Sequence, residues 1–193
     1  MTATGLRELD PTSLLAPGDH VAGAAVALPQ MGRRAVAVEV QALVGSPEGP
    51  ARRQATGLDA RRFSLVAAVL DRAVGLRVGR SELFGAASGG VRVDDPACDL
   101  AIAAAVTSAA TGTPPPRGSA FVGEVALTGL VRPAPAMAQR AAAARAAGCT
   151  LLYAPEGPPT ALEGLRVVPV RHVGDALPWA LRPVETRFAD RSA

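Results

Sequence analysis

The sequence predicts an α+β domain in which a mixed sheet packs against helices. Apolar residues recur at strand spacing in some stretches and at helical spacing in others, without the regular βαβ alternation of a doubly wound parallel sheet. Hydrophobic residues make up 49% of the 193 positions and aromatic residues only 3%, so the core must consist mainly of alanine, valine and leucine. A chain of this length can bury one well-formed core.

The first part of the sheet is predicted to be a β-hairpin. Residues 21–28 and 35–44 are rich in alanine and valine, and the second run sets most of its valines at alternate positions. Gly32 lies between the two runs, where the chain has to turn. The Pro/Gly-rich residues 45–57 that follow are expected to form a mobile loop.

Two helices are predicted in the middle of the chain. The first covers residues 58–75, with Asp59 as its N-cap and Gly75 at its end. The second covers residues 96–110 and is apolar on nearly every side, which indicates a buried helix.

The C-terminal half is predicted to add two more helices and most of the remaining strands. The helices are expected over residues 135–148 and 172–182, the second with a kink or break at Pro178. Residues 83–93 are predicted to be a short strand that gives way to a glycine turn, and residues 130–133 a short extended piece. Strands are predicted over residues 119–127, 149–155 and 165–170, the last of them at a sheet edge.

The start of the buried helix carries three carboxylates in the stretch VRVDDPACDLAIAAA, residues 91–105. An architectural explanation makes Asp95 the N-cap, Pro96 the first helical residue and Asp99 a favourable charge at the positive end of the helix dipole. A chemical explanation notes that some peptidases present a nucleophilic serine in this loop-into-helix geometry, at the place of Ala97. If Asp95 is the cap, its replacement by alanine should cost about 0.5 to 2 kcal/mol and leave the fold intact.

Several reaction types are excluded because all 20 basic residues are arginines. Without lysine the chain has no P-loop for nucleotide phosphates, no amine for a Schiff base and no Ser-Lys dyad. Cys98 and Cys149 form no C-x-x-C pair and are expected to be small buried thiols. The two histidines, His20 and His172, are expected in surface or capping roles. No apolar run reaches the roughly 18 residues of a membrane span, so a soluble, cytoplasmic protein is expected.

The arginine content suggests a contact with phosphates. The formal net charge is +3 and the isoelectric point is about 9.6, which fits a mild affinity for polyanions. A solvated surface whose arginines pair with the 17 acidic residues is the alternative explanation. The candidate DNA contacts are the adjacent pairs Arg33, Arg34, Arg52, Arg53, Arg61 and Arg62.

Three stretches in the same order resemble a known family. GLDARRFSLVAAVLDRAVGL, ASGGVRVDDPACDLAIAAA and FVGEVALTGLVRPAPAMAQRAAAARAAGC are together similar to the C-terminal Lon-protease-like domain of the bacterial RadA (Sms) DNA repair family. The resemblance covers residues 21–155 and implies a Lon-protease-like fold, of the kind also called ribosomal protein S5 domain 2-like. The family-motif or structural positions that it marks are Gly89, Gly90, Arg92, Asp95, Pro96, Asp99, Gly123, Glu124 and Arg132.

The resemblance also implies that the peptidase dyad is lost. Active Lon peptidases carry a nucleophilic serine where this chain has Ala97, and a lysine base where it has Ala138. A methyl group cannot attack a carbonyl carbon. Asp94, Asp95 and Asp99 are therefore expected to be capping and interface groups, and the fold is expected to serve as a scaffold.

The role of the whole family sets the expected partners. Its members act in homologous recombination, where an ATP-driven hexameric ring moves branched DNA and the Lon-like domain contributes ring assembly and DNA contact. Residues 1–19 resemble the linker that follows the ATPase, and residues 20–193 are expected to be the Lon-like domain. ATP, Mg²⁺ and Zn²⁺ are expected only on the preceding family domains, so this chain is expected to bind no cofactor and no metal. Its expected partners are copies of itself, as a hexamer, and DNA, which it binds weakly and without sequence preference; no membrane contact is expected.

Two other functions remain open from the residues. One is a free-standing adaptor of the same fold that binds proteins. The other is a serine hydrolase that uses Ser64, Ser88 or Ser108 together with His20 or His172, although no histidine lies beside these serines in the sequence.

Overall fold

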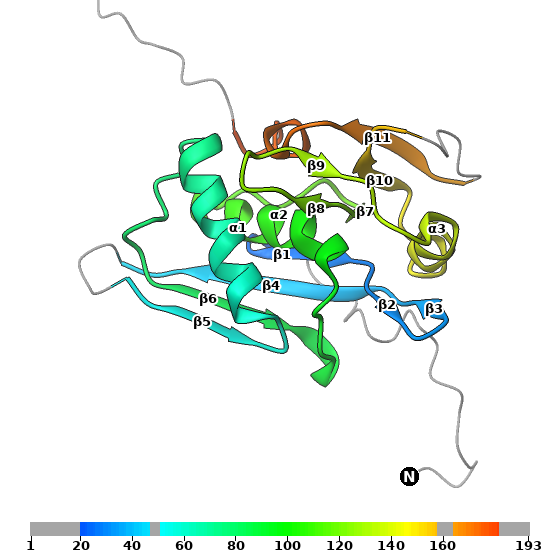
Figure 1. Cartoon of the computed structure of the whole chain (residues 1–193), viewed down its shortest axis with the longest axis horizontal. Helices are drawn as coiled ribbons and strands as arrows, with labels where there is room; N and C mark the ends of the chain where they lie inside the picture. Colours follow the sequence, from blue (N-terminus) through cyan, green and yellow to red (C-terminus); the bar gives the residue numbers. More distant parts are fainter. Residues whose placement is uncertain (1–19, 47–50, 158–163, 182–193) are drawn as a thin grey trace, which may run out of the picture.

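A computed structural model describes residues 20–46, 51–157 and 164–181, and its mixed sheet with packed helices confirms the α+β prediction (Figure 1). The expected linker over residues 1–19 lies outside the described residues. No helix in the described ranges is long and apolar enough to cross a membrane.

The main sheet has seven strands in the order β11-β10-β7-β1-β4-β6-β5. The strands β11, β10, β7 and β1 are mutually parallel, β4 runs against both of its neighbours, and β5 is parallel to β6. The sheet is therefore mixed, with one antiparallel strand near its middle. The strands are β1 (Ala24–Ala27), β4 (Val38–Val44), β5 (Arg53–Thr56), β6 (Leu83–Ala87), β7 (Ser119–Phe121), β10 (Leu151–Pro155) and β11 (Arg166–Val170).

The predicted hairpin is present as the antiparallel pair of β1 and β4, with Ala25 opposite Val40. A smaller pair, β2 (Gln30–Met31) and β3 (Arg34–Ala35), extends from its tip. Gly32 has a φ of 59° in the turn, a conformation that glycine adopts at little cost. Along β4, Val38 and Val40 are buried while Gln41 and Leu43 are exposed, which is the alternation expected from the sequence.

The prediction of a mobile loop over residues 45–57 was wrong for the second half of this segment. Residues 53–56 form β5, an edge strand paired with β6 from Arg53 opposite Leu83 to Thr56 opposite Ala86. The Pro/Gly composition concealed it because the strand is stabilised by a partner about 30 residues away, which no local pattern reveals.

Helix α1 (Ala60–Ala73) begins and ends as predicted. The Asp59 carboxylate accepts hydrogen bonds from the amides of Arg61 and Arg62, both at 2.9 Å. Gly75 follows the last turn with a φ of 69°. The buried face of α1 packs on the sheet and on helix α2 (Asp99–Thr111). That face consists of Phe63, Val66, Ala67, Val69 and Leu70.

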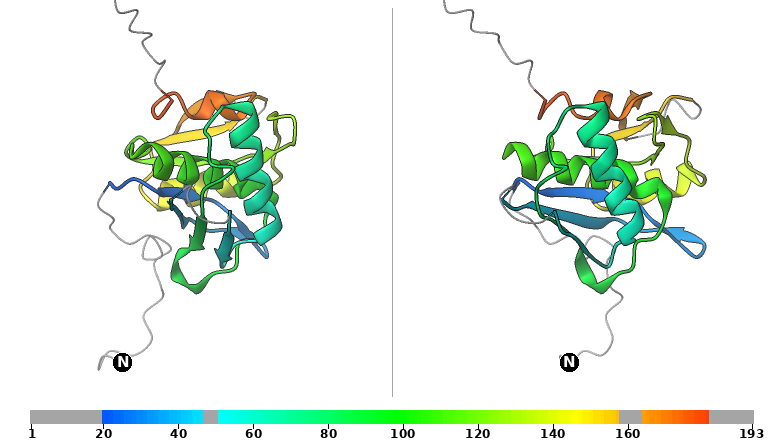
Figure 2. Two further views of the ribbon diagram at one scale, coloured as in Figure 1. Left: turned by 90° about the vertical axis from the view of Figure 1, so that its left-hand side faces the viewer. Right: turned by 60° about the vertical axis from the view of Figure 1, so that its left-hand side comes forward.

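Helices lie on both faces of the sheet. Helix α2 packs against β1 and β4 and is buried along nearly its whole length, as predicted (Figure 2). Helix α3 (Met137–Ala146) belongs to a second apolar cluster, which contains Leu152 of β10, whereas the neighbouring Leu151 belongs to the cluster of α2. Adjacent strand residues point to opposite faces, so α3 covers the face opposite α2 at this end of the sheet.

Two further predictions need correction. The strand expected over residues 119–127 is interrupted at Val122 and Gly123, and it continues as β8 (Glu124–Val125), which pairs with β9 (Val131–Arg132) outside the main sheet. The helix expected over residues 172–182 is only a short 3₁₀ helix, Val173–Ala176, within the described part. Pro178 lacks the amide hydrogen that a longer helix would need there.

The contact between β6 and α1 gives a first prediction. A Cβ atom on Gly85 would lie 2.6 Å from Cε2 of Phe63, whose ring is fully buried. Gly85→Ala should therefore force the ring and helix to shift and lower the free energy of unfolding by about 1 to 3 kcal/mol. Urea unfolding measures the loss. The neighbouring Ala86→Ser, on the opposite face of β6, is the control and should change stability by less than about 0.5 kcal/mol; equal losses would contradict the packing argument.

Candidate functional site

Ala97, the position at which the resemblance expects the nucleophile of active Lon peptidases, lies in a short 3₁₀ helix, Pro96–Cys98, that leads into α2. Its side chain is only 3% exposed and belongs to the apolar cluster that contains Leu28, Ala141 and Leu152. The second position, Ala138, is exposed in the first turn of α3. The methyl group at the nucleophile position is thus part of a packed core.

Asp95 caps this 3₁₀ helix, as the sequence predicted, and also holds a second segment. One carboxylate oxygen, Oδ1, accepts the amide of Ala97 at 2.9 Å. The other, Oδ2, accepts the amide of Gln30 at 2.8 Å, at the start of the β2–β3 pair. The Asp95 carboxylate therefore joins the segment of the lost nucleophile to the tip of the β1–β4 hairpin.

Arg140 brings α3 to the same carboxylate. It is a fully buried arginine, and its Nη2 lies 2.8 Å from Oδ2 of Asp95 as an ion pair whose geometry is not that of a hydrogen bond. Its Nε donates to the carbonyl of Pro135 at 2.9 Å, and its Nη1 donates to the carbonyl of Leu28. Asp95 and Arg140 lie two residues from Ala97 and Ala138 respectively, so this pair joins the two segments that carry these alanines.

The charge environment stabilises the ionised form of Asp95. Burial by itself would raise the pKa of this carboxyl, but the amides of Gln30 and Ala97 and the Arg140 guanidinium outweigh burial and lower its pKa. The Asp95–Arg140 pair is therefore an ion pair at neutral pH.

A second buried ion pair fixes the first turn of α2. Nε of Arg62 donates to Oδ1 of Asp99 at 2.8 Å, and its Nη2 donates to Oδ2. The amide of Val125 donates to the same Oδ2 at 3.1 Å, and Glu124 lies 3.5 Å from the guanidinium. Burial raises the pKa of Asp99, although the hydrogen bonds from Arg62 and Val125 lower it in part. The hydrogen bond to Asp99 raises the pKa of Arg62. The pair links α1, α2 and β8.

Gly123 completes the connection between β7 and β8. Its amide donates to the carbonyl of Ala97 at 2.8 Å, and its own carbonyl accepts the amide of Leu100 at 3.1 Å. It adopts a φ of 154°, and a Cβ atom there would collide with Val131. Gly123 therefore binds both the carbonyl of Ala97 and the amide of Leu100.

The other positions marked by the resemblance are mostly exposed. Gly89 and Gly90 form a turn after β6 with φ values of 74° and 68°. Arg92 is exposed, with its Nε 3.7 Å from Asp94, and Arg132 is exposed on β9. Pro96 takes the first position of the 3₁₀ helix, as predicted. Asp94 makes only a surface ion pair, which stabilises little.

No other described nucleophile lies in a catalytic arrangement. The thiols of Cys98 and Cys149 are free and buried, as predicted; burial raises the pKa of Cys149 to about 11 and that of Cys98 further. The hydroxyl of Ser64 donates to a helix carbonyl, that of Ser88 to Glu39 and that of Ser108 to Thr113.

His20 and His172 both contact backbone carbonyls and not these serines. His20 contacts the carbonyl of Pro115, and Nε2 of His172 lies 3.3 Å from the carbonyl of Thr128. The described ranges contain no group of three His, Cys, Asp or Glu residues placed to hold a metal ion. The hydrogen bonds of these serines and histidines thus form no Ser-His pair.

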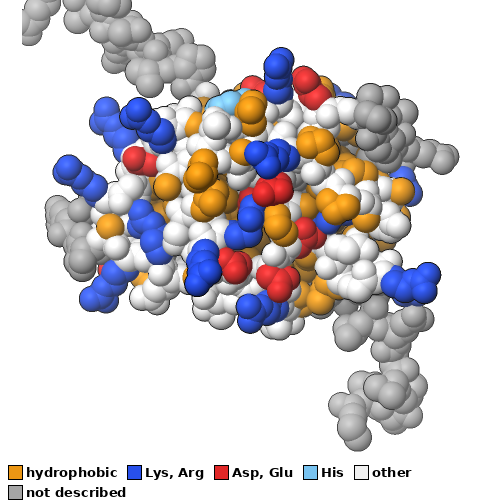
Figure 3. All heavy atoms as spheres, viewed as in Figure 1, with side chains coloured by type: hydrophobic (Ala, Val, Ile, Leu, Met, Phe, Trp, Pro, Cys, Tyr) orange, Lys and Arg blue, Asp and Glu red, His pale blue; other side chains and the backbone are white. Residues whose placement is uncertain are grey.

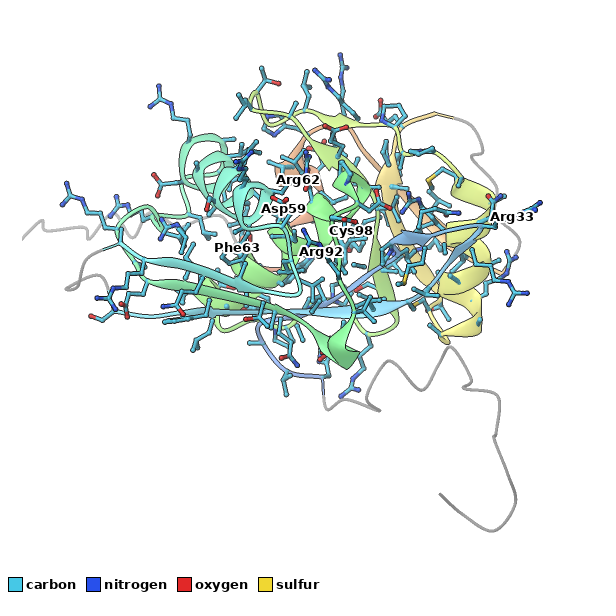
Figure 4. The ribbon with its side chains drawn as sticks, turned by 60° about the horizontal axis from the view of Figure 1, so that its bottom comes forward. Arg33, Asp59, Arg62, Phe63, Arg92 and Cys98 are labelled. Atoms are coloured by element: carbon cyan, nitrogen blue, oxygen red, sulfur yellow. The ribbon has the colours of Figure 1, made fainter. Side chains whose placement is uncertain are left out.

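The six candidate DNA contacts fall into two classes. Arg33 and Arg34 lie at the exposed tip of the β2–β3 pair, where Figure 4 shows Arg33 pointing away from the body. Arg52 and Arg61 are also exposed. The remaining two serve the structure.

Arg53 and Arg62 have internal partners that the sequence did not indicate. The guanidinium of Arg53 donates to the carbonyls of Ser81, Val78 and Gly79. Arg62, which is labelled in Figure 4, forms the ion pair with Asp99. Both guanidinium groups are therefore less available to DNA than those of the exposed arginines.

Sequence reasoning missed a group of arginines at one end of the molecule, which we call the arginine end: Arg52, Arg72, Arg77 and Arg80. All four are exposed. The loop that carries Arg77 and Arg80 is held against the end of α1, because the amide of Gly79 donates to Asp71. Arg53 holds the same loop against β5. The spacing of Arg72, Arg77 and Arg80 within nine residues is the signal in the sequence that indicates this group.

The Asp95–Arg140 pair gives a second prediction. Asp95→Asn retains an oxygen for capping but leaves the buried guanidinium of Arg140 without a counter-charge. The expected loss is about 3 kcal/mol, above the cost of a lost cap, because removal of one partner of a buried pair is strongly destabilising. Chemical unfolding measures it. Asp94→Asn, which alters only the exposed Arg92 pair, is the matched control and should cost about 1 kcal/mol or less. Equal losses would show that Asp95 acts only as a cap.

The lowered pKa of Asp95 gives a third prediction. The folded pKa is below the unfolded value of about 3.9, so the stabilisation is fully present above that pH and is lost as the pH falls through the folded pKa. The difference in unfolding free energy between the wild type and Asp95→Asn should therefore be constant near neutral pH and shrink below about pH 4. Urea unfolding at a series of pH values checks this, and a difference that grows on acidification would contradict it.

Comparison with known proteins places this chain in a family. Residues 85–182, about half of the chain, match the Lon protease (S16) C-terminal proteolytic domain. DNA repair protein RadA of Streptococcus pyogenes serotype M3 is 39% identical over 163 residues, which cover 82% of this chain and 36% of the relative.

Two further relatives agree. DNA repair protein RadA of Bacillus subtilis is 37% identical over 164 residues, covering 83% of this chain and 36% of the relative. That of Mycolicibacterium smegmatis is 36% identical over 157 residues, covering 81% and 34%. The chain thus spans about a third of the length of these relatives. The chain belongs to the family of the Lon protease (S16) C-terminal proteolytic domain and is a RadA-like member of it.

Proposed function

We propose that this chain is a non-catalytic scaffold domain of a RadA-type DNA repair protein, which contributes self-association and DNA contact to branch migration. The proposal places it in the cytoplasm, as a homo-oligomer for which a hexamer is the expected form. It assigns no ATP, Mg²⁺ or Zn²⁺ to these 193 residues, which contain no lysine for a P-loop.

The observation that carries the proposal is that alanine stands at positions 97 and 138, where the resemblance to Lon peptidases expects a serine and a lysine. Ala97 offers no nucleophile, and its side chain packs in an apolar cluster instead of facing solvent. Ala138 offers no base. The Asp95–Arg140 pair braces both segments, so the place where the chemistry of a peptidase would be expected holds a structural contact.

The exposed arginines support the DNA contact. The arginine end gathers four guanidinium groups, and the tip of the β2–β3 pair carries Arg33 and Arg34. Arginine binds phosphate well because its planar group can donate two parallel hydrogen bonds. Each subunit of an oligomer repeats these groups, so weak contacts become substantial through effective concentration.

A protein-binding adaptor of the same fold is the second candidate. It is favoured by the large apolar side chains that the structure leaves exposed, above all Leu127, which is 77% exposed. The serine hydrolase has no such support, because the hydroxyl groups of Ser64, Ser88 and Ser108 donate to groups other than a histidine.

The proposal predicts that the chain does not cleave proteins. Incubation with unfolded casein and with fluorogenic peptides should give no more turnover than a heat-killed sample, because both dyad positions are alanine. Turnover that disappears on replacing Ser64, Ser88 or Ser108 by alanine would instead establish the hydrolase.

The proposal also predicts weak, salt-dependent DNA binding centred on the arginine end. Fluorescence anisotropy with labelled single- and double-stranded DNA should show affinity that falls linearly on a log–log plot of salt concentration, with a slope of about −0.9 per phosphate contacted on duplex DNA. The triple variant Arg72→Ala, Arg77→Ala, Arg80→Ala should flatten the slope by about two to three units.

Two other variants locate the contact. The pair Arg33→Ala, Arg34→Ala tests the β2–β3 tip separately, and Arg166→Ala on the edge strand β11 is the control that should leave the slope unchanged. DNA binding that no arginine variant alters, or no binding at low salt, would count against the DNA contact.

A further inference from the structure

The segment between α1 and β6 exposes two arginines on either side of a buried valine. Val78 is only 1% exposed and belongs to the apolar cluster that contains the buried faces of α1 and α2, whereas Arg77 and Arg80 are exposed. We call residues 77–81 the arginine loop. Figure 3 shows basic side chains gathered at the left of the view, where Figure 1 places the end of α1 and the segment that leads to β6. The loop thus presents two of the four guanidinium groups of the arginine end.

A single guanidinium holds this loop from the side of the sheet. Arg53 of β5 donates hydrogen bonds to three of its carbonyl oxygens, those of Val78 at 3.2 Å, Gly79 at 3.0 Å and Ser81 at 2.5 Å. The planar group has donors in a fixed geometry, so it also fixes the carbonyls that it binds. Carbonyl oxygens carry partial negative charge and would repel a phosphate. Here they are bound to Arg53.

The carboxylate of Asp71 holds the same loop from the side of α1. Its Oδ1 accepts the amide of Gly79 at 2.8 Å. A Cβ atom on Gly79 would lie 3.0 Å from Oδ2 of Asp71, so the loop backbone lies directly against the carboxylate. A negative charge beside four arginines weakens their attraction for a polyanion. The contact of Asp71 with the loop is therefore structural, and it comes at a cost in charge.

The backbone of Arg77 shows how firmly the loop is held. Its φ is 56°, in the left-handed region that residues other than glycine rarely adopt. Such a conformation persists only where the surrounding contacts determine it, and strained residues of this kind cluster at binding sites. The buried Val78 and the two contacts on Gly79 follow directly in the chain. They fix the direction in which the Arg77 side chain leaves the backbone.

The arginines of the loop are also free to bind. Within the described ranges, none of the four members of the arginine end forms a salt bridge with an acidic side chain. A guanidinium that already leaves the backbone in a fixed direction loses less conformational freedom when it binds than one on a mobile loop.

We infer that the arginine loop is preorganised to bind the phosphate groups of a DNA strand, and that Asp71 and Arg53 are its positioning residues. These two side chains act through the loop backbone, while Arg77 and Arg80 contact the phosphates. The inference rests on the DNA contact in the proposed function and names the residues that shape it. It also explains why a carboxylate lies among the arginines.

The test compares two variants of Asp71 that remove the same charge. Asp71→Asn keeps an oxygen that can accept the amide of Gly79, and Asp71→Ala does not. If charge alone mattered, both variants should bind DNA more tightly than the wild type. Positioning predicts that Asp71→Ala binds about fivefold more weakly, whereas Asp71→Asn binds at least as tightly as the wild type. Fluorescence anisotropy with a labelled single-stranded oligonucleotide over a series of salt concentrations measures both.

The salt dependence separates a positioning residue from a contact. Asp71→Ala should lower the affinity at every salt concentration and leave the log–log slope unchanged, because the same phosphates are bound. Arg80→Ala should flatten the slope by about 0.7, the value for one phosphate of a single strand. Asp71 is exposed, so each of its variants should keep the wild-type melting temperature within a few degrees.

A second variant tests the contact from the sheet. Arg53→Gln removes the guanidinium and should weaken DNA binding several-fold more than Arg166→Gln. The latter loses the same charge on β11, the opposite edge strand of the sheet. Hydrogen exchange gives a readout without DNA: the amide of Gly79 should exchange faster in Asp71→Ala than in Asp71→Asn or the wild type.

The possible failures are distinct. Equal DNA affinities of the two Asp71 variants would overturn the positioning role, and so would an exchange rate of the Gly79 amide that neither variant changes. A wild-type chain that binds no DNA at low salt would instead overturn the DNA contact in the proposed function.

Discussion

The carboxylate of Asp95 is the contact on which the arrangement of this domain depends. It accepts amides from the 3₁₀ helix before α2 and from the tip of the first hairpin, and it balances the charge of an arginine that α3 places in the interior. These segments are far apart in the sequence and approach from both faces of the sheet. A buried guanidinium without this carboxylate would be very costly, so the position of α3 and the start of α2 are fixed together.

The Arg62–Asp99 pair fixes α1 against the start of α2, as the Asp95–Arg140 pair fixes α3. Helix α2 is rich in alanine, with 6 alanines among its 13 residues, so many of its side chains offer few distinctive shapes to fix how its neighbours pack. The two ion pairs at its N-terminal end supply directional contacts that small apolar side chains cannot. Buried ionic groups of this kind are well suited to selecting one packing arrangement out of several similar ones.

The sequence predicted what short-range physics determines. The Asp59 cap, the buried face of α1, the apolar α2 and the valine alternation of β4 all follow from residues a few positions apart. It failed where a distant partner decides the outcome. Strand β5 depends on β6, Arg62 is neutralised by a residue 37 positions later, and the Leu28 carbonyl that binds Arg140 is 112 positions away. An arginine in an alanine-rich helix has no local feature that marks it as buried.

The burial of Ala97 and the Asp95–Arg140 pair are physically connected. A catalytic serine and lysine must be held in a partly exposed, polar site in which the lysine amine loses its charge readily, and such an arrangement lowers stability. An alanine at position 97 can instead be drawn into the core, as its 3% exposure demonstrates, and the adjoining carboxylate is then available to neutralise a buried arginine. The exposed arginines are the part of the surface with the chemistry to bind a polyanion, and the exposed leucines, above all Leu127, are side chains of the kind that contact other proteins.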